Sequence, residues 1–210
     1  MSKDKHLIDS SLPVQIAEIL LHRIFTGEFK QGQRLIEADI ASELQVSHAP
    51  VREAFYILQK DNILERLPRR GVSIRTIDNH ELNNYVEILA LLLTKAIRDS
   101  EKKWNANLHD EFVHRVQKTE ELCKEKNILE YVVSTEKLLV LFLEVANNVA
   151  SIRFFNQIAM ITKVAAQTKW TIEKIENYQQ LLKDFYQAIY ELDFTSAIEA
   201  MENAISTAFK

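Results

Sequence analysis

The stretch VSHAPVREAF, residues 46–55, decides the fold of the N-terminal part of this chain. Apolar residues recur here at helical spacing and predict a buried face: Val51, Ala54, Phe55 and Leu58. Ser47 suits the N-cap position, because its hydroxyl can accept a free N–H of the first turn. Pro50 is tolerated in that turn because it has no N–H to leave unpaired. The pattern predicts a helix from about His48 to Lys60.

His48 and Arg52 lie four residues apart and share a different face of this helix. That face starts at the positive end of the helix dipole, where backbone N–H groups and a guanidinium both favour phosphate. A second short helix over residues 36–44 precedes it, with Gln45 to Ser47 as the turn. This spacing is typical of a helix-turn-helix, in which the start of the second helix reaches DNA bases. A capped surface helix without a binding role is the alternative.

The flanking segments complete a winged arrangement. Residues 12–24 show helical periodicity, and residues 63–67 and 72–75 can form two short strands. The strands enclose Pro68, Arg69, Arg70 and Gly71, in which proline and glycine favour a turn. Both arginines are expected to project from its tip. A basic loop of this kind can enter a groove of DNA or grip its phosphates.

Composition is that of an ordinary soluble protein. The chain has 210 residues, 47% of them hydrophobic and 27% charged. The longest apolar runs have about six residues, against the roughly 20 that span a bilayer. The first ten residues are polar and lead into no region of signal-peptide type. The single cysteine, Cys123, makes neither an internal disulfide nor, alone, a zinc site. We expect no membrane segment, no cofactor and a cytoplasmic location.

A compositional break divides the chain in two. All three glycines and all three prolines precede residue 72, so the remainder is best explained by helices joined by short polar loops. The segment DNHE, residues 78–81, has the spacing of a capping box at a helix start. Residues 1–76 carry 11 Lys and Arg against 10 Asp and Glu, a net charge of +1. We predict a mainly α protein: a winged helix-turn-helix over residues 8–76, then an all-helical bundle of about six helices over residues 78–210.

Residues 11–76 resemble the winged helix-turn-helix of GntR-type bacterial transcription regulators. The resemblance rests on four motifs: G-x-F/L-x-x-G-x-R-L at Gly27–Leu35, the E-x-x-I-A that follows, V-S-x-x-P-V-R-E-A at Val46–Ala54, and R-G-V at Arg70–Val72. The later helices are faintly similar to the FCD effector domain of the FadR branch. That likeness rests on Asn148, Asp193, Ala197 and Met201.

The resemblance implies which residues contact DNA. At the start of the recognition helix they are Ser47, His48, Ala49 and Arg52, and at the wing they are Arg70 and Gly71. We add their neighbours Pro50 and Arg69 to the predicted DNA-binding residues. Two positions depart from the family. The position of His48 is usually arginine, and Ala38 stands where some members place a DNA-contacting arginine. Because a guanidinium binds guanine with two hydrogen bonds, we expect a somewhat different operator sequence.

The effector domain departs further. Family members commonly hold a divalent metal with one aspartate and three histidines. A gapless match places Thr135, Leu139, Leu182 and Ala204 at those positions, so no metal is expected. The family's R-x-x-L-E motif corresponds to Ile88–Leu92. Two interpretations stay open for these residues: packed helix-bundle core, or a cavity for an apolar effector such as an acyl chain, in which a small polar acid would lack a partner.

These observations predict a homodimeric transcription regulator, most simply a repressor, that binds a palindromic double-stranded DNA operator. A helical-bundle enzyme is the competitor from another class. Against it, the sequence has no nucleophile with a base, no phosphate-binding glycine loop and no carboxylate–histidine metal motif. A helical interaction module that has lost DNA binding is the third alternative, and the mild charge of residues 1–76 keeps it open.

Overall fold

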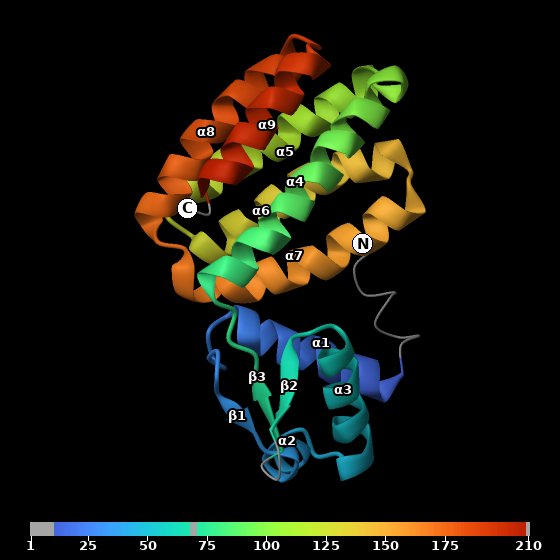
Figure 1. The fold of residues 1–210 in the computed structure, drawn as a ribbon, viewed down its shortest axis with the longest axis vertical. Coiled ribbons are helices and arrows are strands. Elements are labelled where there is room, and N and C mark those ends of the chain that lie inside the picture. Colours follow the sequence, from blue (N-terminus) through green and yellow to red (C-terminus); the bar gives the residue numbers. More distant parts are fainter. Residues whose placement is uncertain (1–10, 68–70, 209–210) are drawn as a thin grey trace. The chain divides into compact units, whose positions relative to one another are not determined.

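The computed structural model describes residues 11–67 and 71–208, except for the side chains of residues 166–169. Contacts divide the chain into two compact units, Met1–Ile77 and Asp78–Lys210 (Figure 1). Each unit has its own buried core. None of the described helices is long and apolar enough to cross a membrane.

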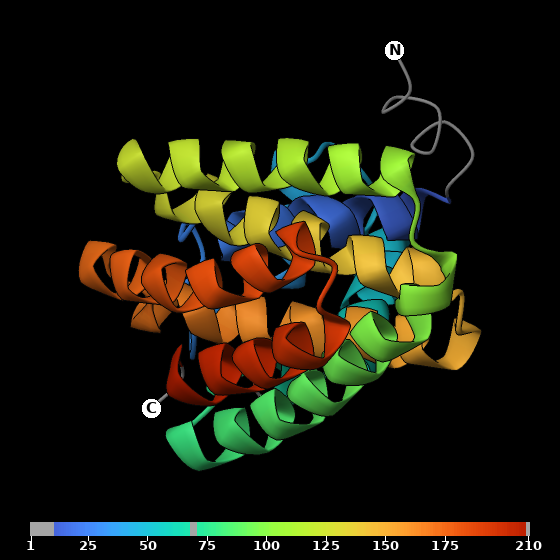
Figure 2. The ribbon, with the colours of Figure 1, turned by 90° about the horizontal axis from the view of Figure 1, so that it is seen from above.

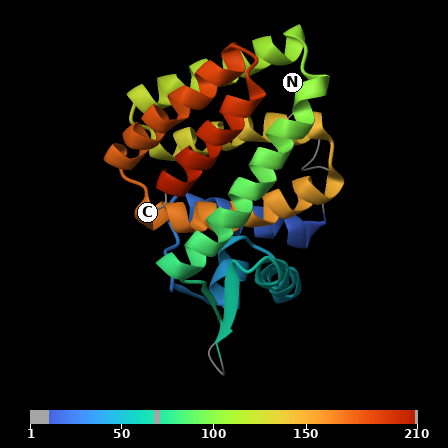
Figure 3. The same cartoon turned by 45° about the horizontal axis from the view of Figure 1, so that its top comes forward.

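The first unit combines three helices with a small sheet. The helices are α1 (Leu12–Phe25), α2 (Glu37–Glu43) and α3 (His48–Lys60), and the strands are β1 (Arg34–Leu35), β2 (Leu64–Leu67) and β3 (Gly71–Ile74). The antiparallel sheet has the order β1-β3-β2. In the view of Figure 3, α3 lies beside the hairpin of β2 and β3. The predicted winged helix-turn-helix and its hairpin are confirmed.

The turn between α2 and α3 is tight because one residue reverses the backbone. Gln45 has a φ of 55°, in the left-handed region. The backbone N–H of Val46 then donates to the carbonyl of Ala41 over 3.0 Å. Ile40 and Ala41 on α2 and Val51 on α3 are buried, so the two helices pack through small and branched side chains. This packing fixes which side of α3 faces outward.

Strand β1 was not predicted. It has two residues, Arg34 and Leu35, which pair with Ser73 and Val72 of β3. Two residues are too few to show the alternation that identifies a strand in a sequence. The strand exists because β3 supplies its hydrogen-bonding partner. It brings Arg34 to the same sheet as the hairpin.

The described part of the second unit is entirely helical. Its elements are α4 (Asn79–Ser100), a 3-10 turn η1 (Glu101–Lys103), α5 (Ala106–Lys124), α6 (Ile128–Ala146), α7 (Val149–Lys169), α8 (Ile172–Tyr190) and α9 (Phe194–Ala208). Helix α4 starts where the sequence predicted, because the Asp78 carboxylate accepts the N–H of Glu81 over 2.8 Å. Helix α9 packs between α4 and α8 (Figure 2). The predicted bundle of about six helices is confirmed.

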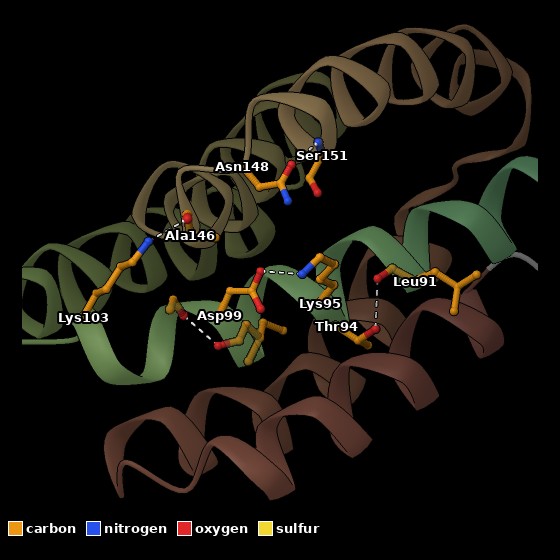
Figure 4. Close-up of polar contacts among 10 residues, drawn as sticks. Leu91, Thr94, Lys95, Asp99, Lys103, Ala146, Asn148 and Ser151 are labelled. Carbon is orange, nitrogen blue, oxygen red and sulfur yellow. Dashed lines mark hydrogen bonds and ion pairs between the residues drawn. The ribbon is translucent and has the colours of Figure 1, made fainter.

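Polar contacts close the junction between α6 and α7 (Figure 4). The Lys103 ammonium donates to the carbonyl of Ala146 over 2.7 Å, which satisfies an unpaired carbonyl at the end of α6. Asn147 then adopts a left-handed conformation with a φ of 54°. The Asn148 side chain accepts the N–H of Ser151 over 3.0 Å and caps α7. The chain reverses here without glycine or proline, because asparagine tolerates the left-handed region.

Aromatic side chains form the centre of the bundle. Phe112 is fully buried, and its ring makes edge-on contacts with Phe142 and Phe185. Trp104 stacks on Phe142, with ring centroids 5.0 Å apart and planes inclined by 11°. These rings come from the end of η1 and from α5, α6 and α8, so they tie four segments of the unit together. Such pairs stabilise a core beyond the burial of their area.

Candidate functional site

The start of α3 is exposed on one side only. Ser47, His48, Ala49 and Arg52 lie at the surface, whereas Pro50 is half-buried. On the opposite side the predicted apolar face is buried: Val51, Ala54, Phe55 and Leu58. The buried face holds the helix in one rotation, so the polar edge points to solvent as a unit. This is the arrangement that a recognition helix requires.

Ser47 does not make the capping bond that the sequence predicted. It occupies the N-cap position in an extended conformation, but its hydroxyl forms no cap hydrogen bond. Pro50, the third residue of the helix, removes one of the two N–H groups that a cap side chain normally binds, and the N–H of Ala49 is not bound by Ser47 either. The prediction of a cap was therefore wrong in its contact, though right in the position where the helix begins. Ser47 is exposed to solvent.

Glu37, the first residue of α2, contacts both Arg52 and His48 of this edge. Its carboxylate accepts from Arg52 Nη2 over 2.8 Å and from Arg52 Nε over 3.1 Å. It also lies 3.2 Å from His48 Nδ1. The hydrogen bonds from Arg52 lower the pKa of Glu37, and the same pair raises the pKa of Arg52. The arginine and the acid therefore stay charged together at neutral pH.

An open hollow of about 250 Å³ lies between α3 and the sheet. Three arginines from different elements line it: Arg34 of β1, Arg52 of α3 and Arg66 of β2. Glu37 is the acid among the lining residues. The net charge of residues 1–76 is small, yet the fold gathers cations on this one surface. A phosphate placed here would meet more positive than negative charge.

Sequence reasoning missed Glu37, Arg34 and Arg66 as parts of this surface. Glu37 and Arg34 stand within the motifs that resemble the GntR type, which was the available signal. Gly71 begins β3 with a φ of 86°, a conformation that favours glycine. Arg69 and Arg70, the other predicted wing residues, lie outside the described residues.

The family model described as bacterial regulatory proteins, gntR family, matches residues 12–74, which span all three helices and the sheet of the first unit. The first unit is therefore similar to the bacterial regulatory proteins of the gntR family. His48 and Ala38 are the two positions at which the sequence departs from the GntR-type pattern. Ala38 is exposed in the first turn of α2 and offers no polar side chain to DNA.

Relatives extend the similarity beyond the first unit. The HTH-type transcriptional regulator YdhC of Bacillus subtilis is 29% identical over 158 residues, which cover 61% of this chain and 70% of that protein. The gluconate operon transcriptional repressor of Bacillus licheniformis is 31% identical over 121 residues, covering 58% of this chain and 48% of that protein.

A solved structure shows the same fold over nearly the whole chain. A GntR transcriptional regulator from Rhodococcus sp. RHA1 has a TM-score of 0.83 at 18% identity, covering 95% of this chain and 96% of that chain. The two relatives named above are described as transcription regulators.

The second unit contains a small cavity of about 70 Å³. Of the residues predicted to face an effector, Thr135 and Leu139 line it. Leu182 and Ala204 are fully buried elsewhere in the core.

The residues predicted on α4 do not reach the cavity. Ile88 is 47% exposed and Leu92 is half-buried, and neither lines the cavity. The prediction for α4 chose the wrong face, because its inward side carries Leu89 and Leu93. Both faces of α4 contain apolar residues, so periodicity did not separate them.

The cavity wall is less apolar than the sequence indicated. Lys163 of α7 forms an ion pair with Glu136 of α6, and both side chains line the cavity. Burial lowers the pKa of Lys163 to about 8, because the charged form loses hydration. The wall therefore carries an ion pair beside its apolar side chains, and the expectation that a small polar acid would lack a partner here stays a prediction.

The family's metal ligands have no counterpart at the matched positions. Thr135 Oγ1 donates to the carbonyl of Tyr131 over 2.9 Å, and Leu139, Leu182 and Ala204 carry no donor atoms. In the ranges 11–67 and 71–208, no three His, Cys, Asp or Glu side chains lie close enough to hold a metal ion. These residues do not fit a divalent metal site.

Proposed function

We propose that this protein is a sequence-specific repressor that places the start of α3 in the major groove of an operator. The observation that carries the proposal is the polar edge of Ser47, His48, Ala49 and Arg52, held outward by the buried face of α3. A helix in this position presents its first residues to base edges. Arg34, Arg66 and the wing residues Arg69, Arg70 and Gly71 would contact phosphates or the neighbouring groove. A regulator of this kind works in the cytoplasm.

Replacement of Arg52 with alanine tests this placement. We expect operator binding to weaken by roughly 5- to 100-fold, because one two-donor base contact is lost. Lys60→Ala is the matched control, since Lys60 is an exposed cation at the opposite end of the same helix. A gel-shift titration on DNA selected from random duplexes measures both variants. Equal affinities for Arg52→Ala, Lys60→Ala and the unchanged protein would exclude the docking model.

The protein is further proposed to act as a homodimer on a palindromic operator. Two recognition helices must be held about one helical turn apart on DNA, which a two-fold symmetric dimer achieves. Helix α4 offers an exposed apolar surface for the second copy, with Ile88 at 47% and Leu91 at 64% exposure. Light scattering should give a mass near twice 24.4 kDa, and Leu91→Lys should lower it. A monomer at micromolar concentration, also on DNA, would contradict this assembly.

For the two units we propose a GntR-type DNA-binding domain over residues 8–76 and an FCD-like domain over residues 78–210. The cavity of about 70 Å³ is roughly half of the ~150 Å³ that accommodates benzene. Its small size favours a domain that serves mainly in dimerisation over one that holds an acyl chain. Native mass spectrometry and metal analysis of freshly purified protein test this. A copurifying lipid would contradict the filled cavity, and stoichiometric zinc, nickel or manganese would contradict the metal-free domain.

A further inference from the structure

We propose that Glu37 is a positioning residue that decides which bases Arg52 and His48 read. This inference rests on the proposed docking of α3 in the major groove. One carboxylate holds both side chains: two hydrogen bonds from Arg52, of 2.8 and 3.1 Å, and one contact of 3.2 Å with His48 Nδ1. Glu37 itself is the first residue of α2, and its side chain is only 26% exposed. It is therefore a fixed support beneath two exposed base-reading groups.

For Arg52, the contact determines which edge of the guanidinium is left for DNA. The group has five N–H donors in a planar fork. Glu37 binds the side that carries Nε and Nη2. The outer edge, with Nη1 and the second hydrogen of Nη2, stays available, and the side chain is 61% exposed. Two parallel donors match the N7 and O6 acceptors of guanine. The ion pair thus prepares Arg52 to bind guanine end-on.

For His48, the contact fixes the tautomer. An ionised carboxylate is only an acceptor, so Nδ1 must carry the proton in the bond to Glu37. In the neutral ring, Nε2 is then an acceptor. An acceptor pairs with the amino group of adenine or cytosine in the major groove, and not with guanine. Glu37 thereby gives the two side chains opposite preferences.

A general electrostatic role for Glu37 predicts a different result. A carboxylate in the hollow lined by Arg34, Arg52 and Arg66 repels phosphate, so its removal should raise affinity for any DNA sequence. A positioning role adds a loss of base discrimination. Loss of the charge raises affinity for all DNA, whereas loss of positioning lowers discrimination between bases. Measuring affinity and discrimination together therefore separates the two roles. Asp39, an exposed acid in the same first turn of α2, provides the matched control for charge.

The experiment measures sequence preference and affinity for Glu37→Ala and Asp39→Ala beside the unchanged protein. Selection from random duplex DNA first identifies the guanine whose preference is lost in Arg52→Ala. For Glu37→Ala we expect discrimination at that guanine to fall by roughly 5- to 100-fold, with unchanged or higher affinity for unrelated DNA. The preference for adenine or cytosine that His48→Ala removes should also weaken. Asp39→Ala should keep both preferences.

A double variant and a conservative variant complete the test. In the Arg52→Ala background, Glu37→Ala should cause no further loss at the guanine, because the side chain it positions is gone. Glu37→Gln keeps the shape of the side chain but replaces one acceptor with a donor, so it should also lose base discrimination. This variant provides the test if Glu37→Ala does not fold. Base discrimination equal to that of the unchanged protein in both Glu37 variants would overturn the inference. An equal loss of affinity for operator and for unrelated DNA would also overturn it. An unchanged protein that selects no sequence would instead refute the proposed function.

Discussion

Replacing Lys163 with methionine should remove a pH dependence from the stability of the helical unit. Lys163 lies in the cavity wall beside Glu136, and its side chain is only 21% exposed. Burial lowers its pKa from the ordinary 10.5 to about 8. Keeping this ammonium charged in the folded protein therefore costs about 3 kcal/mol relative to the unfolded chain. The cost is present at neutral pH and disappears when the group is neutral in both states.

The sign of the effect follows from proton binding. Between pH 8 and 10.5 the unfolded chain holds the Lys163 proton more often than the folded protein does. The free energy of unfolding therefore rises with pH in this window and falls again as the pH is lowered towards 8. From pH 7 to pH 9 we expect Lys163 to contribute a gain of about 1 kcal/mol. The Lys163→Met variant should lack this gain.

Urea unfolding at pH 7, 8 and 9, followed by tryptophan fluorescence, measures the effect. Both tryptophans, Trp104 and Trp170, lie in the helical unit, so the signal reports on that unit. The free energy of unfolding will itself differ between the two proteins, because Glu136 loses its partner in the variant. The quantity compared is therefore the slope of the free energy of unfolding against pH. Lys174→Met, which removes an exposed lysine of α8, is the control and should keep the slope. Identical pH dependence in Lys163→Met and the unchanged protein would refute the reasoning.

Other single substitutions test the caps, the core and the wing. Asp78→Ala should lower the free energy of unfolding by about 1 kcal/mol because it removes a cap, whereas Ser47→Ala should leave it unchanged because no cap bond exists; thermal melting distinguishes them. Phe112→Ala should cost roughly 3–5 kcal/mol in urea unfolding, since the ring is fully buried, and a similar loss for Phe154→Ala, exposed by 54%, would contradict this explanation. Arg69→Ala should reduce the salt slope of DNA binding by about 1 with little change of sequence preference, and an unaltered slope in gel shifts would exclude a phosphate contact.

The sequence determined the elements whose signals are local. The helix at His48–Lys60 was predicted within its bounds, because its apolar spacing, Ser47 and Pro50 all lie within 14 residues. The start of α4 was predicted for the same reason: Asp78 and Glu81 form the cap with each other. Absence of glycine and proline after residue 71 likewise predicted the helical unit. Such signals depend on the chain's neighbours along the sequence, so no tertiary information is needed.

Only the tertiary structure decided the contacts between elements. The carboxylate of Glu37 meets His48 and Arg52, 11 and 15 residues further along, because α2 and α3 pack against each other. Lys163 reaches Glu136 because α6 and α7 lie together in the bundle. The inward face of α4 was likewise set by its neighbours and not by its own pattern. Periodicity shows that a helix has an apolar side, but the partner that covers this side selects which charged groups come together, and those pairs determine the chemistry of both candidate sites.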